Sequence, residues 1–156
     1  MKVLVAGVGN IFLGDDGFGV EVVRRMGQRP GIRVVDFGIR GLDLTYALLE
    51  PHDFVVLVDV ARRGGRPGTL YLMEVPEVGD DSACLEAHGM VPAQVFRAVR
   101  SMGGTLTNVF VVACEPESFG EPGVGRMGLS PSVEASIDGA IAMIESLVQR
   151  GLAAHA

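Results

Sequence analysis

The most apolar stretch of this chain is DFVVLVDV, residues 53–60. An uninterrupted run of Val, Leu and Phe is typical of a β-strand buried on both faces, as in a parallel sheet covered by helices. We therefore predict a central strand here. Asp59 ends it, and an ionised carboxylate among apolar neighbours requires a partner to offset its desolvation. Asp59 is thus either a structural turn residue or a functional group.

Strands and helices alternate on both sides of this central strand. Other strands are predicted at residues 2–7, 32–37, 68–75 and 108–114. Helices are predicted at residues 17–26, 42–49 and 92–102 and from Ser130 onward, and a surface loop at 77–89. In the last helix, Ser130 is expected at the N-cap and Pro131 at the first helical position.

The link between the central strand and the strand at 68–75 is too short for a helical crossover. This strand should therefore run antiparallel to its predecessor. The order of elements predicts an α/β fold, a three-layer α/β/α sandwich with a mostly parallel five-stranded sheet and one antiparallel strand. We expect a single domain over residues 1–156.

Composition and charge narrow the classes of partner. The 156 residues carry a formal net charge of −6, which argues against a nucleic-acid backbone as the main partner. No segment approaches the ~18 uninterrupted apolar residues that a membrane span requires. Two cysteines, Cys84 and Cys114, cannot form a disulfide scaffold and fit a reducing compartment. We expect a cytoplasmic protein with neither nucleic-acid nor membrane partners.

Acidic residues mark the carboxyl ends of two predicted strands. Asp15 and Asp16 follow the glycine turn after the first strand, and Asp59 ends the central one. Sites of open parallel sheets lie beyond the carboxyl ends of their strands, so these side chains should meet at one edge. For Asp16 the simpler interpretation is helix capping, favourable by ~0.3–1 kcal/mol.

A metal site at this edge would need one more ligand, and the chain has three histidines. His155 lies in the C-terminal tail, and His52 precedes the central strand and so lies at its wrong end. His88 lies in the predicted loop and can reach the carboxyl edge. With two carboxylates it would complete a three-ligand set with open positions; otherwise it is a solvated loop residue.

Dinucleotide binding is a competing interpretation of the first glycine turn. Gly7 and Gly9 follow a strand, and Asp36 ends the second strand, where a ribose-binding acid would lie. However, Phe12 occupies the position of the third glycine of the motif. Asp16 and its neighbour would also place negative charge where the pyrophosphate docks on the helix N-terminus. We reject this interpretation.

A receiver-like signalling module, phosphorylated on Asp59, is the alternative function. It would share the acidic pair after the first strand and the aspartate at the end of the third. That chemistry uses a lysine after the last strand, but this chain has Cys-Glu-Pro-Glu at 114–117 and its only lysine is Lys2.

The glycine turn itself carries a family resemblance. GVGNIFLGDDGFG, residues 7–19, resembles the opening motif of the nickel–iron hydrogenase maturation endopeptidases. The likeness continues through nearly the whole chain, in LVD at 57–59, HGM at 88–90, CEPE at 114–117 and GLSPSVEA at 128–135. The resemblance implies a cytoplasmic enzyme that removes the C-terminal extension of a hydrogenase large-subunit precursor after nickel insertion.

The resemblance also implies a set of site residues. In the family, the second acid of the opening motif, the aspartate ending the central strand and the loop histidine hold a metal, and these correspond to Asp16, Asp59 and His88. We take them as metal contacts and candidate catalytic residues, without assigning the general base. The nickel would be carried by the precursor, and no organic cofactor is implied. Neither cysteine resembles a nucleophile, and Cys114 is expected to be a buried, inert thiol.

One segment departs from the family pattern. After the second strand the family often has an Asp-Gly-Gly-Thr-type turn, whereas this chain has DFGIRG at 36–41. We interpret the difference as one of precursor recognition, with Asp36 and Arg40 as candidate substrate contacts.

Overall fold

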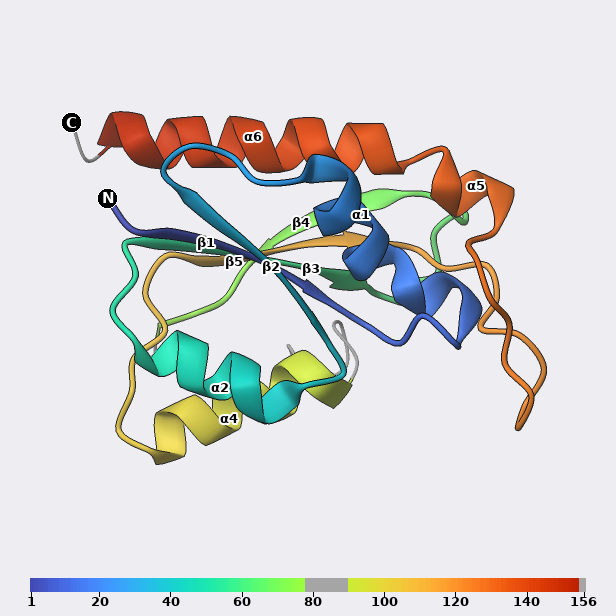
Figure 1. Cartoon of the computed structure of the whole chain (residues 1–156), viewed down its shortest axis with the longest axis horizontal. Helices are drawn as coiled ribbons and strands as arrows, with labels where there is room; N and C mark the ends of the chain where they lie inside the picture. Colours follow the sequence, from blue (N-terminus) through green and yellow to red (C-terminus); the bar gives the residue numbers. More distant parts are fainter. Residues whose placement is uncertain (78–89, 155–156) are drawn as a thin grey trace.

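The computed structural model describes residues 1–77 and 90–154, so His88, Cys84 and His155 lie outside the described residues (Figure 1). The strands of the sheet are β1 (Val3–Val8), β2 (Ile32–Gly38), β3 (Phe54–Val60), β4 (Leu70–Glu74) and β5 (Val109–Cys114). The described helices are α1 (Phe18–Met26), α2 (Gly41–Leu49), α4 (Met90–Ser101), α5 (Pro131–Glu134) and α6 (Ile137–Ala154), with a 3-10 turn η1 (Gly14–Gly17).

The strands form one five-stranded sheet in the order β2-β1-β3-β5-β4. All neighbouring pairs are parallel except β4 and β5. The predicted α/β sandwich is therefore confirmed, and so is the antiparallel direction of β4. Because β5 lies between them, β4 does not pair with β3. Strand β3 is central and buried along its whole length, as its apolar sequence predicted.

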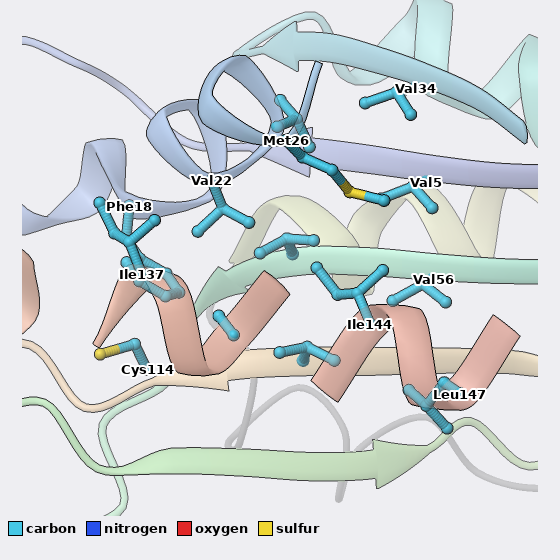
Figure 2. Close-up of a cluster of buried hydrophobic side chains, with 14 of the residues drawn as sticks. Val5, Phe18, Val22, Met26, Val34, Val56, Cys114, Ile137, Ile144 and Leu147 are labelled. Atoms are coloured by element: carbon cyan, nitrogen blue, oxygen red, sulfur yellow. The ribbon is translucent and has the colours of Figure 1, made fainter. Parts of the chain in front are cut away.

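Helices cover both faces of the sheet. In Figure 1, α1 and α6 lie on one face and α2 and α4 on the other. Figure 2 shows the core on the α1 and α6 side, where Phe18, Val22 and Ile144 pack against Val5 and Val56. A second cluster fills the opposite face. Complete burial of such a side chain contributes about 1.5–3 kcal/mol, so these two layers hold the strand ends in place.

The C-terminal helix differs from its prediction in two ways. It is divided into α5 and α6, and the Ser136 hydroxyl between them donates to the Val133 carbonyl oxygen at 2.7 Å. Ser130 does lie at the N-cap, but its side chain makes no capping hydrogen bond. Tertiary structure turns the Ser130 hydroxyl toward Asp15, and the hydroxyl donates a charge-assisted hydrogen bond to the Asp15 carboxylate.

Helix α4 begins at Met90, so Pro92 is its third residue rather than its first. Across the described residues, no helix combines the length and apolar character needed to cross a membrane.

Candidate active site

Glycine contacts set the position of the candidate site, at the carboxyl ends of β1 and β3. A Cβ atom on Gly19 would lie 2.0 Å from the Val58 carbonyl oxygen and 2.5 Å from that of Val8. Gly9 has a φ of +140°, and its Cβ would lie 1.8 Å from the Asp16 carbonyl oxygen. Only glycine permits these approaches, so the start of α1 packs directly on the two strand ends. This packing brings Asp16 to the edge that holds Asp59, the penultimate residue of β3.

Asp59 is a buried carboxylate, and few contacts with the described residues offset the cost of its desolvation. Its side chain is 5% exposed, and its Oδ1 accepts one hydrogen bond, from the Val60 N–H at 2.8 Å. Within residues 1–77 and 90–154, no Lys or Arg forms an ion pair with it. Burial raises the pKa of Asp59 well above its ordinary value; the Val60 N–H offsets part of this effect, and the nearby negative charge of Asp16 adds to it.

Asp16 is half-buried and turns toward its own loop. Its Oδ2 accepts a hydrogen bond from the Asn10 N–H at 2.9 Å, while Asn10 Oδ1 accepts one from the Phe12 N–H at 2.9 Å. Burial raises the pKa of Asp16, and the Asn10 N–H opposes that rise. Gly17 is the N-cap of α1, and Asp16 lies in the first turn of η1 directly before it. A favourable interaction of the Asp16 charge with the helix N-terminus therefore stays a prediction beside the functional one.

Among the described residues, no positively charged side chain pairs with either of the two carboxylates. Asp59 Oδ2 and Asp16 Oδ1 make no hydrogen bond to the described residues. Two hard oxygen ligands of this kind suit a divalent cation, which would offset the desolvation that raises both pKa values and the repulsion from Asp16 that adds to the rise at Asp59. No group of three metal-ligating side chains is found among the described residues. His88, the expected third ligand, lies outside them.

Asp15, the other half of the acidic pair, is a structural residue. It is fully buried, and its Oδ1 accepts a hydrogen bond from the Ser130 N–H at 2.7 Å. Its Oδ2 accepts three more, from the Ser130 hydroxyl and from the N–H groups of Glu117 and Ser118, at 2.8–2.9 Å. Burial would raise the pKa of Asp15, but these hydrogen bonds outweigh it and lower the pKa. Adjacent acids thus have opposite environments.

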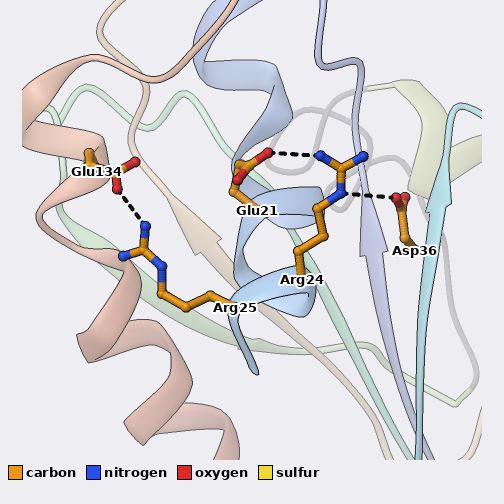
Figure 3. A network of polar contacts seen from close by, with 5 residues as sticks. All are labelled: Glu21, Arg24, Arg25, Asp36 and Glu134. Atoms are coloured by element: carbon orange, nitrogen blue, oxygen red, sulfur yellow. Dashed lines mark hydrogen bonds and ion pairs between the residues drawn. The ribbon is translucent and has the colours of Figure 1, made fainter. Parts of the chain in front are cut away.

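Asp36 and Arg40 lie close in sequence, and the Arg40 guanidinium donates a hydrogen bond to the Asp36 carbonyl oxygen, but their side chains form different ion pairs. Figure 3 shows Arg24 of α1 between Glu21 and Asp36, at 3.3 Å and 3.8 Å. Asp36 also lines a cavity of about 170 Å³ together with Phe12. The Arg40 guanidinium donates to the carbonyl oxygens of its own turn and pairs with Asp43 at 3.3 Å. Asp36 therefore lines the cavity and pairs with Arg24, whereas Arg40 stabilises the start of α2.

Comparison with known proteins shows the family to which this chain belongs. A sequence model described as hydrogenase maturation protease matches residues 20–147. The chain belongs to the hydrogenase maturation protease family. It is 30% identical over 151 residues to the hydrogenase 2 maturation protease of Escherichia coli, covering 92% of this chain and 88% of that protein. It is 31% identical over 153 residues to the coenzyme F420 hydrogenase subunit delta of Methanothermobacter thermautotrophicus, covering 92% of both.

Solved structures of the hydrogenase maturation proteases agree with the fold. The hydrogenase maturating endopeptidase HybD from E. coli superposes with a TM-score of 0.76 at 27% identity, covering 96% of this chain and 93% of that chain. The maturation peptidase from Thaumarchaeota archaeon SCGC_AB-539-E09 gives 0.72 at 27% identity, covering 96% and 99%. The predicted family and the protease activity are confirmed, and none of these matches supports the receiver-like alternative.

Sequence reasoning missed Glu115 as a structural part of this protease edge. Its side chain is buried, and its Oε1 accepts hydrogen bonds from the Arg63 N–H, the Gly65 N–H and the Tyr71 hydroxyl at 2.7–3.0 Å. Burial opposes ionisation, but these donors outweigh it and lower the pKa of Glu115. Glu115 therefore fixes the loop that follows Asp59. Its place in the CEPE segment of the family resemblance was the available signal.

Cys114 lies in the core beneath this edge, as expected. It is fully buried, and its Sγ lies 3.3 Å from the Ser136 hydroxyl oxygen. Burial raises the pKa of the thiol, which leaves it protonated and poorly nucleophilic.

Proposed function

We propose that this protease removes the C-terminal extension of a nickel–iron hydrogenase large-subunit precursor after nickel insertion. The observation that carries the proposal is the buried Asp59 carboxylate, which lies beside Asp16 without a neutralising charge among the described residues. Family membership supports the precursor as the partner. The cytoplasm is the compartment expected from the cysteine content and the resemblance.

The nickel is proposed to arrive as part of the substrate. Cysteine thiolates of a precursor would be stronger nickel ligands than carboxylates, so Asp16 and Asp59 should bind free nickel only weakly. Their unpartnered oxygens can instead complete the coordination of nickel already held by the precursor, with His88 as the proposed third contact. The protease would then select a loaded precursor, and the metal would serve as a template or Lewis acid at the scissile carbonyl.

The carboxylates offer a second kind of chemistry. A carboxylate whose pKa is raised by burial is a better proton acceptor near neutral pH than an ordinary aspartate, and both Asp16 and Asp59 fulfil this condition. Either can accept the proton of an attacking water molecule. The general base is therefore one of these two residues, without further assignment.

The decisive experiment compares nickel-loaded and nickel-free precursor. Metal-stripped enzyme is incubated with each form, and the mass of the large subunit is followed. We expect cleavage of the loaded precursor alone, without added metal, and no cleavage of casein. Equal cleavage of both precursors would refute substrate-borne nickel and favour a resident metal.

Variants of the proposed contacts provide the complementary test. Asp16→Asn, Asp59→Asn and His88→Ala should each abolish processing with the far-ultraviolet circular dichroism spectrum unchanged. The matched controls are Cys84→Ser and Cys114→Ala, which should retain processing because no thiolate takes part. Loss of processing in a folded cysteine double variant would contradict the proposed chemistry.

A further inference from the structure

Large apolar side chains are exposed together beside the candidate active site. The exposed fractions are 64% for Phe12, 40% for Leu13, 77% for Val124 and 63% for Met127. We call these four residues the apolar rim. Single exposed apolar residues are ordinary on protein surfaces, whereas a contiguous group marks an interaction site.

Backbone hydrogen bonds join the two loops that carry the apolar rim. The Arg126 N–H donates to the Phe12 carbonyl oxygen at 2.9 Å, and the Gly14 N–H donates to the Arg126 carbonyl oxygen at 2.7 Å. Leu13 and Arg126 form an isolated parallel bridge. In Figure 1 both loops, blue before α1 and orange before α5, lie at the same end of the molecule. The two backbone segments that carry the apolar rim therefore lie side by side.

The loop before α5 is held in a defined conformation. Gly125 has a φ of +74°, and a Cβ atom there would lie 2.2 Å from the Phe12 carbonyl oxygen. Gly120 has a φ of +88°, and its Cβ would lie 2.4 Å from the carbonyl carbon of Gly125. At the base of the loop, the Asp15 carboxylate binds Glu117, Ser118 and Ser130. Val124 and Met127 are thus presented to solvent by a tightly packed backbone.

The apolar rim also adjoins the proposed chemistry. Phe12 belongs to the same loop as Asp16, and it lines the cavity of Asp36 together with Ile39. Ile39 is itself 66% exposed. The part of the apolar rim at Phe12 and Leu13 therefore lies within a few residues of Asp16, where a polypeptide bound at the candidate site has apolar surface beside it. Met and aromatic side chains are enriched at the centres of protein interfaces, which suits a protein rather than a small molecule as the occupant.

We propose that the apolar rim is the docking surface for apolar side chains of the precursor next to its cleavage site. This inference rests on the proposed function, because the precursor is the occupant. Rigid presentation lowers the entropic cost of association, since the loop need not be ordered on binding. The apolar rim should consequently determine the KM for the precursor and leave the chemical step nearly unchanged.

The test uses substitutions at exposed positions with a matched control. Met127→Asp and the double variant Val124→Asp/Met127→Asp place charge on the apolar rim, and Val124→Ser is a milder second variant. Met102→Asp is the control, because Met102 is 53% exposed and lies between α4 and β5, at the opposite edge of the sheet. KM and kcat for nickel-loaded precursor are obtained from initial rates of mass conversion, and thermal midpoints are measured for every variant.

We expect KM to rise about tenfold for the Asp variants of the apolar rim, with kcat within about twofold of wild type. Met102→Asp should change neither, and all thermal midpoints should be unaltered. Wild-type kinetics in Met127→Asp, Val124→Ser and the double variant would overturn the inference. If sedimentation shows that wild type dimerises and the Asp variants do not, the occupant is a second copy and the proposal is wrong. Failure of wild type to cleave any precursor would refute the proposed function instead.

Discussion

The same substitution, Asp to Asn, should affect different properties at the two adjacent aspartates. Asp15→Asn removes the charge that four donors of the loop before α5 share, whereas Asp16→Asn alters a side chain with one hydrogen bond. We therefore expect Asp15→Asn to lose stability and Asp16→Asn to lose activity with little change in stability.

The hydrogen bonds of Asp15 set the size of the effect. An asparagine amide has one oxygen, so its NH2 group must face either the Ser130 N–H or the three donors to Oδ2. In the better orientation one buried donor is left unsatisfied and three bonds lose their ionic character. Leaving a buried donor unpaired costs ~1–3 kcal/mol, and a hydrogen bond to a charged group contributes more to stability than one to a neutral group. We therefore expect the free energy of unfolding to fall by about 3 kcal/mol. Asp16→Asn keeps an acceptor for the Asn10 N–H and should change stability by less than about 1 kcal/mol.

The measurement is urea and thermal unfolding of both variants at pH 7, followed by circular dichroism. A loss of about 3 kcal/mol corresponds to a thermal midpoint lower by roughly 6–12 °C for a chain of this size. Precursor processing is measured below the lower midpoint. Equal stability of the two variants would refute the structural role of Asp15, and full activity of Asp16→Asn would refute its role in the site.

Three further variants test the neighbouring parts of the edge. Asp59→Asn should raise the free energy of unfolding by about 1 kcal/mol in urea titrations, because it removes a desolvated charge and keeps an acceptor for Val60; a destabilised variant would mean that Asp59 is structural. Glu115→Gln should cost about 2 kcal/mol at pH 7. Since the folded pKa of Glu115 lies below the ordinary 4.5, the wild-type advantage is present above pH 4.5 and should disappear as pH falls through the folded pKa in acid-titrated melts. Gly19→Ala should destabilise by about 3 kcal/mol, since its Cβ would lie 2.0 Å from a carbonyl oxygen, and an unchanged melting curve would contradict the packing of α1.

The sheet could be predicted because its information is local. The apolar run of β3 requires cover on both faces, and a link without a helix requires reversal before β4. These two features, with the rule that carboxyl ends of parallel strands share an edge, were enough to bring Asp16 and Asp59 together. None of these steps needs knowledge of a contact between distant residues.

What the sequence did not reveal depends on long-range contacts. The bonds that distinguish Asp15 from Asp16 join residues 102 to 115 positions apart. A further long-range bond turns the Ser130 hydroxyl toward the Asp15 carboxylate, and Ser130 makes no side-chain capping hydrogen bond of the kind that local preference predicts. Glu115 likewise binds the loop after β3 across 50 and 52 positions. Local sequence patterns therefore locate the acidic residues, but only their long-range contacts show which of them are structural.

The contrast between the acids also bears on the proposed recognition of nickel. Asp15 and Glu115 are ionised because protein donors surround them, so their charge adds to stability. Burial raises the pKa of Asp59, the acidic neighbour Asp16 adds to the rise, and among the described residues only the Val60 N–H opposes it, so the ionisation of Asp59 opposes folding. On the proposed function, a cation brought by the precursor would relieve this opposition at the moment of binding, and the relief would add to its affinity. A nickel-free precursor has no such contribution, so the protease can discriminate the two forms through the same carboxylates that contact the metal.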